Sequence, residues 1–232
     1  MNIVYAMTRN VYEWILPSIK SLYEHNPEAN VFIVCEDDEL PFKIPFDAKI
    51  INVLSQTIFT KDSINYNNAF KYINLLKVCY PTILPELDKV IHLDIDTIIC
   101  DDLTPLYNLD LTDKWVGACP EYKGTYKPFG DMYYNMGIAV INLEQMRKDK
   151  ISEKLVLYLN TIKQPWADQD AWNKYGLEQD KFVTFPVRYN ENRMCGYTDN
   201  PAIIHYCSIR NWWTNPTMHR VEYLNKYKNA VI

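Results

Sequence analysis

Glycine is scarce in this chain of 232 residues, which contains only six. Their spacings form no G-x-G-x-x-G, no G-x-x-x-x-G-K and no G-x-S-x-G pattern. Dinucleotide-binding folds, P-loops and the nucleophile elbow of hydrolases are therefore disfavoured. If the chain binds a nucleotide phosphate, a metal ion and basic side chains must hold it, because the usual glycine-rich backbone cradle is missing.

Excess positive charge, paired cysteines and long apolar runs are lacking as well. Lysine and arginine number 24 against 29 aspartates and glutamates, and the net charge of −5 argues against a nucleic-acid partner. None of the six cysteines forms a C-x-x-C pair, which favours reduced thiols over zinc ligands. No apolar run approaches the roughly 20 residues that span a bilayer. We therefore expect no transmembrane segment and a cytoplasmic protein, with peripheral attachment to a membrane as the alternative.

Apolar residues follow a pattern in which short strands alternate with helices. Strands are predicted at 2–5, 31–35, 49–53, 89–93, 116–119, 138–141, 182–185 and 202–204. Helices are predicted after an N-cap at Asn10, over about 68–80 and 143–162, and from Asp168 and Val221. No repeat or linker divides the chain, so we expect a single domain, residues 1–232. The alternation favours the α/β class, with a three-layer α/β/α sandwich around a mainly parallel, mixed central sheet.

Two carboxylates follow the apolar strand 89–93, in the sequence Asp94-Ile95-Asp96. On an extended backbone both aspartates would point to one side while Ile95 points into the core, at the strand end where α/β sheets bind ligands. Hard divalent cations prefer such oxygen ligands. His205 ends another short apolar strand and could supply a third ligand. The alternative is a pair of loop or capping aspartates and a histidine that is merely hydrogen-bonded.

Several further segments accompany the D-x-D in an order that one known family shows. They are the strand 2–6 with Asn10, Lys77 seventeen residues before Asp94, the segment 134–143 with Asn135, the triplet Asp168-Gln169-Asp170 with Asn173, and His205-Tyr206 followed by Trp212 and Trp213. Together they resemble the retaining glycosyltransferases of the GT-A fold that are related to glycogenin and to bacterial lipopolysaccharide galactosyltransferases, called glycosyltransferase family 8. The resemblance covers nearly the whole chain.

The resemblance implies a metal-dependent hexosyltransferase. Such an enzyme moves a hexose or a pentose from a nucleoside-diphosphate sugar, UDP-linked in most members, to a hydroxyl of a glycan or a lipid-linked sugar, with retention of anomeric configuration. It further implies that Asp94, Asp96 and His205 hold Mn²⁺, with Mg²⁺ as the alternative ion, and that phosphate oxygens complete the octahedron.

The resemblance also assigns the other site residues. Gln169, Asp168 and Asp170 are expected beside the reacting carbon. The donor nucleotide sugar is expected to contact Ala6, Thr8, Asn10, Lys77, Ile95, Asn135 and Arg210. Independent of the resemblance, the residue types leave plainer roles open: an N-cap for Asp168, a turn for Asn135 and a solvated helix face for Lys77.

Two positions depart from the family pattern. Thr8 stands where many members carry an aspartate that contacts the uracil ring. The closing H-x-x-G-x-x-K-P-W motif lacks its glycine, lysine and proline over 208–213, and Arg210 is the candidate replacement for the lysine that binds the leaving diphosphate.

Two other functions compete with glycosyl transfer. The segment Asp94-Ile95-Asp96-Thr97 is similar to the D-x-D-x-T motif of haloacid dehalogenase-like phosphatases, in which the first aspartate is the nucleophile, but its threonine stands one position early, about ninety residues precede it and no G-D-x-x-x-D follows. The second alternative is a non-catalytic sugar-binding domain of the same fold. Acceptor contacts are expected from the 121–133 loop and the C-terminal third, among Tyr126, Phe129, Arg188, Tyr189 and Tyr197.

Overall fold

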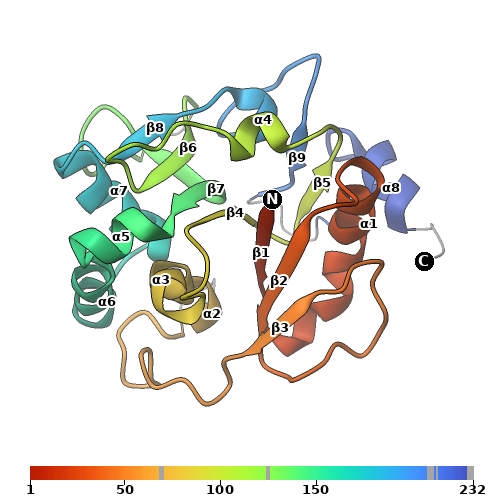
Figure 1. The fold of residues 1–232 in the computed structure, drawn as a ribbon. Coiled ribbons are helices and arrows are strands. Elements are labelled where there is room, and N and C mark those ends of the chain that lie inside the picture. Colours follow the sequence, from red (N-terminus) through yellow and green to blue (C-terminus); the bar gives the residue numbers. More distant parts are fainter. Residues whose placement is uncertain (68–70, 124–125, 208–211, 213, 229–232) are drawn as a thin grey trace.

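A seven-stranded sheet forms the centre of the protein in the computed structural model, which describes residues 1–67, 71–123, 126–207, 212 and 214–228 (Figure 1). The strand order is β3-β2-β1-β4-β7-β6-β8. The strands are β1 (Asn2–Ala6), β2 (Asn30–Cys35), β3 (Lys49–Asn52), β4 (Lys89–Leu93), β6 (Val116–Pro120), β7 (Tyr134–Asn142) and β8 (Phe182–Thr184). Strand β7 runs antiparallel to β4 and β6, and the other four pairings are parallel. The predicted mainly parallel, mixed sheet is confirmed.

Helices cover both faces of this sheet because its side chains are apolar on both sides. Along β1, Ile3 and Tyr5 belong to one buried cluster with α1, while Val4 and Ala6 belong to another with α2, α5 and α6. The α-helices are α1 (Leu16–His25), α2 (Lys71–Leu75), α3 (Tyr80–Ile83), α4 (Thr104–Tyr107), α5 (Leu143–Asp149), α6 (Ile151–Thr161), α7 (Asp168–Glu178) and α8 (Val221–Lys228). Figure 1 shows α1 on one side of the sheet and α2, α3, α5 and α6 on the other, which confirms the predicted α/β/α sandwich.

Three predicted helices begin or continue differently in the structure. Asn10 is not an N-cap: residues Arg9–Ile15 form a 3₁₀ helix, η1, and α1 begins only at Leu16, where Pro17 in the first turn costs no hydrogen bond. The 68–80 prediction corresponds to α2, the 3₁₀ helix η2 (Leu76–Cys79) and α3, with residues 68–70 outside the described part. The helix predicted over 143–162 is divided by Lys150, whose φ of 52° ends α5.

A second sheet, which the sequence pattern did not predict, joins β5 (Thr97–Ile99) antiparallel to β9 (Ile203–His205). Its register pairs Thr97 with His205, and the Tyr206 amide donates to the Asp96 carbonyl at 2.9 Å. The D-x-D therefore lies in the turn between β4 and β5, and not on an extended strand as expected. The two sheets together bring residues about 110 positions apart in the chain to one place.

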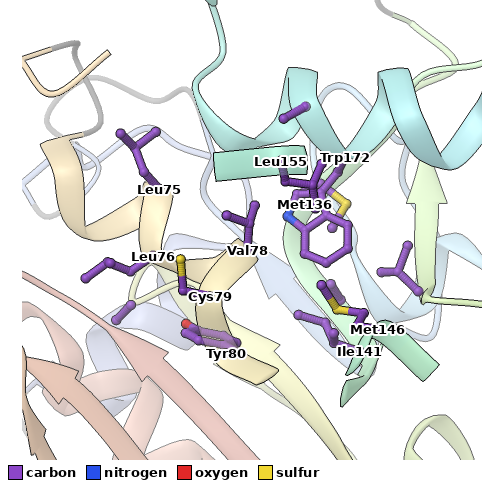
Figure 2. Packing of buried hydrophobic residues seen from close by; sticks show 14 of the residues in the cluster. Leu75, Leu76, Val78, Cys79, Tyr80, Met136, Ile141, Met146, Leu155 and Trp172 are labelled. Carbon is purple, nitrogen blue, oxygen red and sulfur yellow. The ribbon is translucent and has the colours of Figure 1, made fainter. Parts of the chain in front are cut away.

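The helical segment from 71 to 83 is fixed by apolar packing on the sheet (Figure 2). Its buried side chains face side chains of β7, α5, α6 and α7 across the same cluster. The labelled members are Leu75, Leu76, Val78, Cys79, Tyr80, Met136, Ile141, Met146, Leu155 and Trp172. Because this packing fixes η2, it also fixes the direction in which Lys77 enters the site. Across the described ranges, every helix is too short or too polar to span a bilayer.

Candidate active site

A cavity of about 430 Å³ opens at the carboxyl ends of β1 and β4, the edge at which ligands bind to sheets of this class. Most of the predicted site residues line it: Ala6, Thr8, Asn10, Lys77, Asp94, Ile95, Asp96, Asn135, Asp168, Gln169 and His205. Asp170 is not among the described residues that line it, and Arg210 and Trp213 lie outside the described part of the chain. The structure thus brings together residues from many separate elements and loops, from β1 to β9.

Asp94, Asp96 and His205 form a compact cluster inside the cavity. The His205 Nε2 atom lies 3.3 Å from Asp96 Oδ1 and 3.8 Å from Asp94 Oδ2, and one ligand atom of each residue lies within 4.8 Å of the others. The Nδ1 atom of His205 lies 2.9 Å from the Asn190 side-chain oxygen, which can only accept, so Nδ1 carries the proton. In neutral His205 this leaves a lone pair on Nε2, directed at the carboxylates.

The Nε2 atom of His205 is buried and has no hydrogen-bond partner among the described residues. Burial alone would lower the pKa of His205, but the charges of Asp96 and Asp94 outweigh it and raise that pKa. The cluster therefore attracts a positive charge to this point. A divalent cation satisfies the orphaned nitrogen and both carboxylates at once.

Gly137 on β7 leaves room for the imidazole of His205 beside the carboxylate of Asp94. A Cβ atom at this position would meet His205 Cε1 at 2.2 Å and Asp94 Oδ2 at 2.8 Å. These contacts are too close for any larger residue, so the lack of a side chain at 137 permits the approach of His205 to the two aspartates. The donor set of two carboxylates and an imidazole fits a divalent metal ion.

Lys77 and His92 bind the oxygen of Asp94 that faces away from His205. Lys77 Nζ and His92 Nε2 each lie 2.9 Å from Asp94 Oδ1. Lys77 is buried, with 5% of its side chain exposed, so it does not lie on a solvated helix face. Burial and the charge of Lys77 lower the pKa of His92 to about 4, which keeps its ring neutral. Burial opposes ionisation of Asp94 as well, but Lys77 and the hydrogen bond from His92 hold its pKa below the ordinary value.

Asp168 begins α7 but does not cap it. The N-cap position is Ala167, whose φ of 54° and ψ of −128° turn the chain sharply into the helix. The Oδ2 atom of Asp168 is buried without a hydrogen-bond partner in the described ranges, and Lys77 Nζ approaches it only to 4.0 Å. Burial raises the pKa of Asp168 to about 7, although Lys77 acts in the opposite direction.

Asp170 supports the cavity wall from behind. Its carboxylate accepts a hydrogen bond from the Tyr133 hydroxyl at 2.7 Å and from the Trp166 amide at 2.8 Å. Trp166 itself lines the cavity. These bonds give Asp170 a clear role in fixing the residues just before Asp168, and burial raises its pKa.

Glu121 joins the two amide side chains of the site, and the sequence motifs did not indicate it. Its Oε1 atom accepts from Asn135 Nδ2 at 2.9 Å and from Gln169 Nε2 at 3.3 Å. Gln169 Oε1 in turn accepts from the Met136 amide at 2.9 Å. Asn135 lies within β7 and not in a turn. The sequence indicated Glu121 only by its position, two residues after the end of the strand predicted at 116–119.

The outer rim of the cavity is more exposed. Here the Thr8 hydroxyl donates to Asn10 Oδ1 at 2.6 Å. Trp14 and Trp212 meet edge to face with ring centroids 6.1 Å apart, and both line the cavity. Trp14, like Trp166, was not predicted. The described acceptor candidates Tyr126, Phe129, Arg188, Tyr189 and Tyr197 are not among the residues that line the cavity.

Comparisons with known proteins agree with this site. A family model described as "Glycosyl transferase family 8" matches residues 2–216. The chain is 27% identical to General stress protein A of Bacillus subtilis, over 71% of this chain and 69% of that protein. It is 28% identical to Glycosyltransferase GlyA of Streptococcus pneumoniae, over 91% of this chain but 32% of that protein.

Solved structures share the fold over the whole length. A crystal structure of the galactosyltransferase LgtC in complex with donor and acceptor sugar analogs is 22% identical, with a TM-score of 0.76, and the match covers 100% of this chain and 98% of that one. The glycosyltransferase GlyE of Streptococcus pneumoniae is 20% identical, with a TM-score of 0.75, over 99% of this chain and 60% of that one.

Proposed function

The chain belongs to glycosyl transferase family 8 and is a glycosyltransferase, and from this premise we propose that it is a metal-dependent, retaining enzyme that uses a nucleoside-diphosphate sugar. The proposed donor is a UDP-linked hexose or pentose, and the proposed acceptor is a hydroxyl of a glycan or a lipid-linked sugar. The observation that carries the proposal is the cluster of Asp94, Asp96 and His205, which packs against Gly137. The donor and acceptor sugar analogs named for LgtC support the substrate class.

Asp94 Oδ2, Asp96 Oδ1 and His205 Nε2 would hold the metal ion, for which Mn²⁺ suits mixed oxygen and imidazole ligands. When bound, the ion supplies positive charge to the diphosphate as it leaves. Without a cation the two aspartates would repel a diphosphate. Lys77 does not replace the ion, because its ammonium group already faces Asp94 and Asp168.

The donor sugar is proposed to lie against Gln169, Asn135 and Glu121. The amide nitrogens of Gln169 and Asn135 both point to Glu121, so the second carboxylate oxygen of Glu121 is available to a sugar hydroxyl. Asp168 Oδ2, buried beside them, could stabilise positive charge that develops on the anomeric carbon. Asp170 is retained in the site as the residue that fixes Trp166.

The nucleotide is proposed to lie along the outer rim, between the end of β1 and the D-x-D turn. Ala6, Thr8, Asn10 and Ile95 line the cavity there. Arg210 remains the proposed partner of the diphosphate. The phosphatase alternative is set aside because the family match places the chain among glycosyltransferases. A non-catalytic sugar-binding domain is left as an outcome of the test below.

The test is hydrolysis of the donor in water by the whole chain, since we propose that residues 1–232 form one catalytic domain. UDP release from UDP-glucose, UDP-galactose and UDP-xylose is measured with Mn²⁺ and with EDTA. We expect one donor to be hydrolysed only with Mn²⁺, and we expect Asp96→Asn to abolish the reaction. Asp62→Asn, an exposed aspartate away from the cavity, is the matched control.

Two results would overturn the proposal. If Asp96→Asn releases UDP as fast as the parent, the metal assignment is wrong. If calorimetry in Mn²⁺ buffer registers no heat with UDP, GDP or any of the sugar nucleotides, the donor class is wrong. Donor binding without hydrolysis or transfer would favour the non-catalytic domain.

A further inference from the structure

The two oxygens of Asp94 have different surroundings. Oδ1 lies 2.9 Å from Lys77 Nζ and 2.9 Å from His92 Nε2. Oδ2 lies 3.8 Å from His205 Nε2, and it lies 2.8 Å from the position that a Cβ atom on Gly137 would take. Because an ionised carboxylate only accepts hydrogen bonds, both neighbours of Oδ1 must be donors. One oxygen is therefore bound by the protein, and the other faces the cluster.

His92 owes its orientation to a second buried group. It is the one polar side chain within the otherwise apolar β4 after its first residue, and it is fully buried, as is Tyr80. Its Nδ1 atom lies 3.0 Å from the Tyr80 hydroxyl. Since Nε2 carries the proton given to Asp94, Nδ1 of the neutral ring is an acceptor and the Tyr80 hydroxyl donates to it. The hydrogen bonds thus run in one direction, from Tyr80 to His92 to Asp94.

The backbone of Asp94 is fixed as well. Its amide donates to the Gly137 carbonyl at 2.7 Å, and its carbonyl accepts from the Thr97 hydroxyl at 2.8 Å. With the main chain fixed on both sides, the carboxylate can move only by rotation about the Cα–Cβ and Cβ–Cγ bonds. The hydrogen bonds to Oδ1 oppose both rotations.

We infer that His92, oriented by Tyr80, is a positioning residue that makes Asp94 a one-oxygen ligand of the metal. This inference rests on the proposed function. A carboxylate restricted to Oδ2 suits Mn²⁺ and Mg²⁺, which prefer octahedral geometry, and penalises Ca²⁺, which takes six to eight oxygens and often binds both oxygens of a carboxylate. Tyr80 and His92 therefore set both the affinity for Mn²⁺ and its preference over Ca²⁺.

The test measures metal binding and not catalysis. Free Mn²⁺ is followed by electron paramagnetic resonance as metal-free protein is titrated, and Ca²⁺ is then added as a competitor. We expect His92→Leu, which keeps the volume but removes both nitrogens, to weaken Mn²⁺ binding about 10-fold or more, the usual cost of losing such a supporting partner. The ratio of Mn²⁺ to Ca²⁺ affinity should fall in the same variant.

Two more variants separate orientation from packing. His92→Gln can place an amide N–H near the position of the imidazole Nε2 and should restore most of the affinity for Mn²⁺ and the preference over Ca²⁺. Tyr80→Phe should lower both the affinity for Mn²⁺ and the preference over Ca²⁺, but by less than His92→Leu does. Tyr134→Phe is the matched control, because it also removes the hydroxyl hydrogen bond of a buried tyrosine, here to the exposed Thr184 on the edge strand β8, without touching Asp94.

The outcomes are distinguishable. If the parent protein binds no Mn²⁺, the proposed function fails and takes this inference with it. If the parent binds Mn²⁺ and a folded His92→Leu binds Mn²⁺ and Ca²⁺ each as tightly as the parent does, the inference alone is wrong. It is also wrong if His92→Gln is as weak as His92→Leu. If circular dichroism shows that His92→Leu does not fold, His92→Gln and Tyr80→Phe test the inference instead. The inference is then refuted if Tyr80→Phe and Tyr134→Phe have the same Mn²⁺ affinity and the same ratio of Mn²⁺ to Ca²⁺ affinity.

Discussion

The metal side of the cavity and its outer rim are built in different ways. On the metal side, formed by Asp94, Asp96, His205 and Lys77, polar atoms are bonded from several elements, and only 5% of the Lys77 side chain and 1% of the His205 side chain are exposed. On the outer rim, Asn10 and the 36% exposed Trp14 lie on a 3₁₀ helix.

The two parts of the cavity differ in what holds their side chains in place. Strand register and close packing fix the metal side, so a change there is resisted by both sheets and the helices behind them. On the rim, a side chain can move with little cost because water replaces its partners. Substitutions should therefore have large effects on the metal side and small effects on the rim.

The largest effect is expected for Lys77→Met in metal-free protein. This change leaves the buried Asp168 and the partly buried Asp94 without the cation that both face. Removing one partner of a buried ion pair costs about 3–5 kcal/mol of unfolding free energy. Urea denaturation in EDTA at pH 8 measures it.

Lys89→Met is the control for that loss. Lys89 is also partly buried, but it donates to the carbonyls of Tyr107 and Leu109 and pairs with no carboxylate among the described residues. Lys89→Met should therefore lower the unfolding free energy clearly less than Lys77→Met does. Equal destabilisation by the two substitutions would show that the ion pairs of Lys77 do not hold the metal side together.

Gly137→Ala should produce the next largest effect, on metal binding. The new Cβ would lie 2.2 Å from His205 Cε1, so the imidazole must leave its place beside the carboxylates. We expect Mn²⁺ affinity to fall about 100-fold, which corresponds to about 2.7 kcal/mol. Calorimetric titration with Mn²⁺ measures the change.

Gly117→Ala is the matched control in the neighbouring strand β6. Its Cβ would meet Leu109 Cδ2 at 2.3 Å, far from the metal ligands. It should lower stability while leaving Mn²⁺ affinity as in the parent. If Gly137→Ala binds Mn²⁺ as tightly as the parent, the place of the His205 imidazole beside Gly137 is not needed for metal binding.

The same contrast explains how much could be predicted from the sequence. The central sheet was predicted because apolar runs mark its strands, and Asp94, Asp96 and His205 were found because they stand at strand ends. Their mutual distance could not be predicted, because the small β5–β9 sheet that sets it has strands of only three residues each. Short strands carry almost no periodic signal.

Residues that act through long-range contacts were missed. Glu121 has no motif of its own, and its role depends on amides that arrive from β7 and α7. His92 is a polar residue in an apolar strand, but its partner Tyr80 lies on a helical segment that the sequence pattern did not divide correctly. Trp14 falls within the helix predicted after Asn10, whereas the structure places it on the 3₁₀ helix η1 at the rim.

The effect expected from Asp168→Asn depends on pH, and per pH unit it is smaller than the effects above. Burial raises the pKa of Asp168 from 3.8 to about 7 in the folded protein. Between these values the folded state binds a proton that the unfolded state releases, so stability falls as pH rises through this range and is level above it. The slope is at most about 1.4 kcal/mol per pH unit.

The asparagine variant should lack this component. We compare the unfolding free energies of variant and parent without metal from pH 4 to 8. Their difference isolates the contribution of Asp168, because groups that titrate in both proteins cancel. Asp110→Asn is the control, because hydrogen bonds from Thr112 lower the pKa of Asp110 and confine its contribution to more acidic solutions. A constant difference between Asp168→Asn and the parent across this range would show that Asp168 is ionised throughout.

The smallest effect is expected on the rim, from Thr8→Ala. The substitution removes an exposed hydrogen bond to Asn10, which is a proposed contact of the donor. A bond of this kind contributes about 0.5–1.5 kcal/mol, so KM for the donor should rise about 2- to 10-fold while kcat and Mn²⁺ affinity stay unchanged. Thr112→Ala breaks a similar exposed bond, to Asp110 Oδ1 at 2.7 Å, away from the cavity and should alter none of these values. A fall in Mn²⁺ affinity in Thr8→Ala would mean that the rim and the metal side are one coupled unit, because the loss of an exposed hydroxyl would then reach ligands that two sheets hold in place.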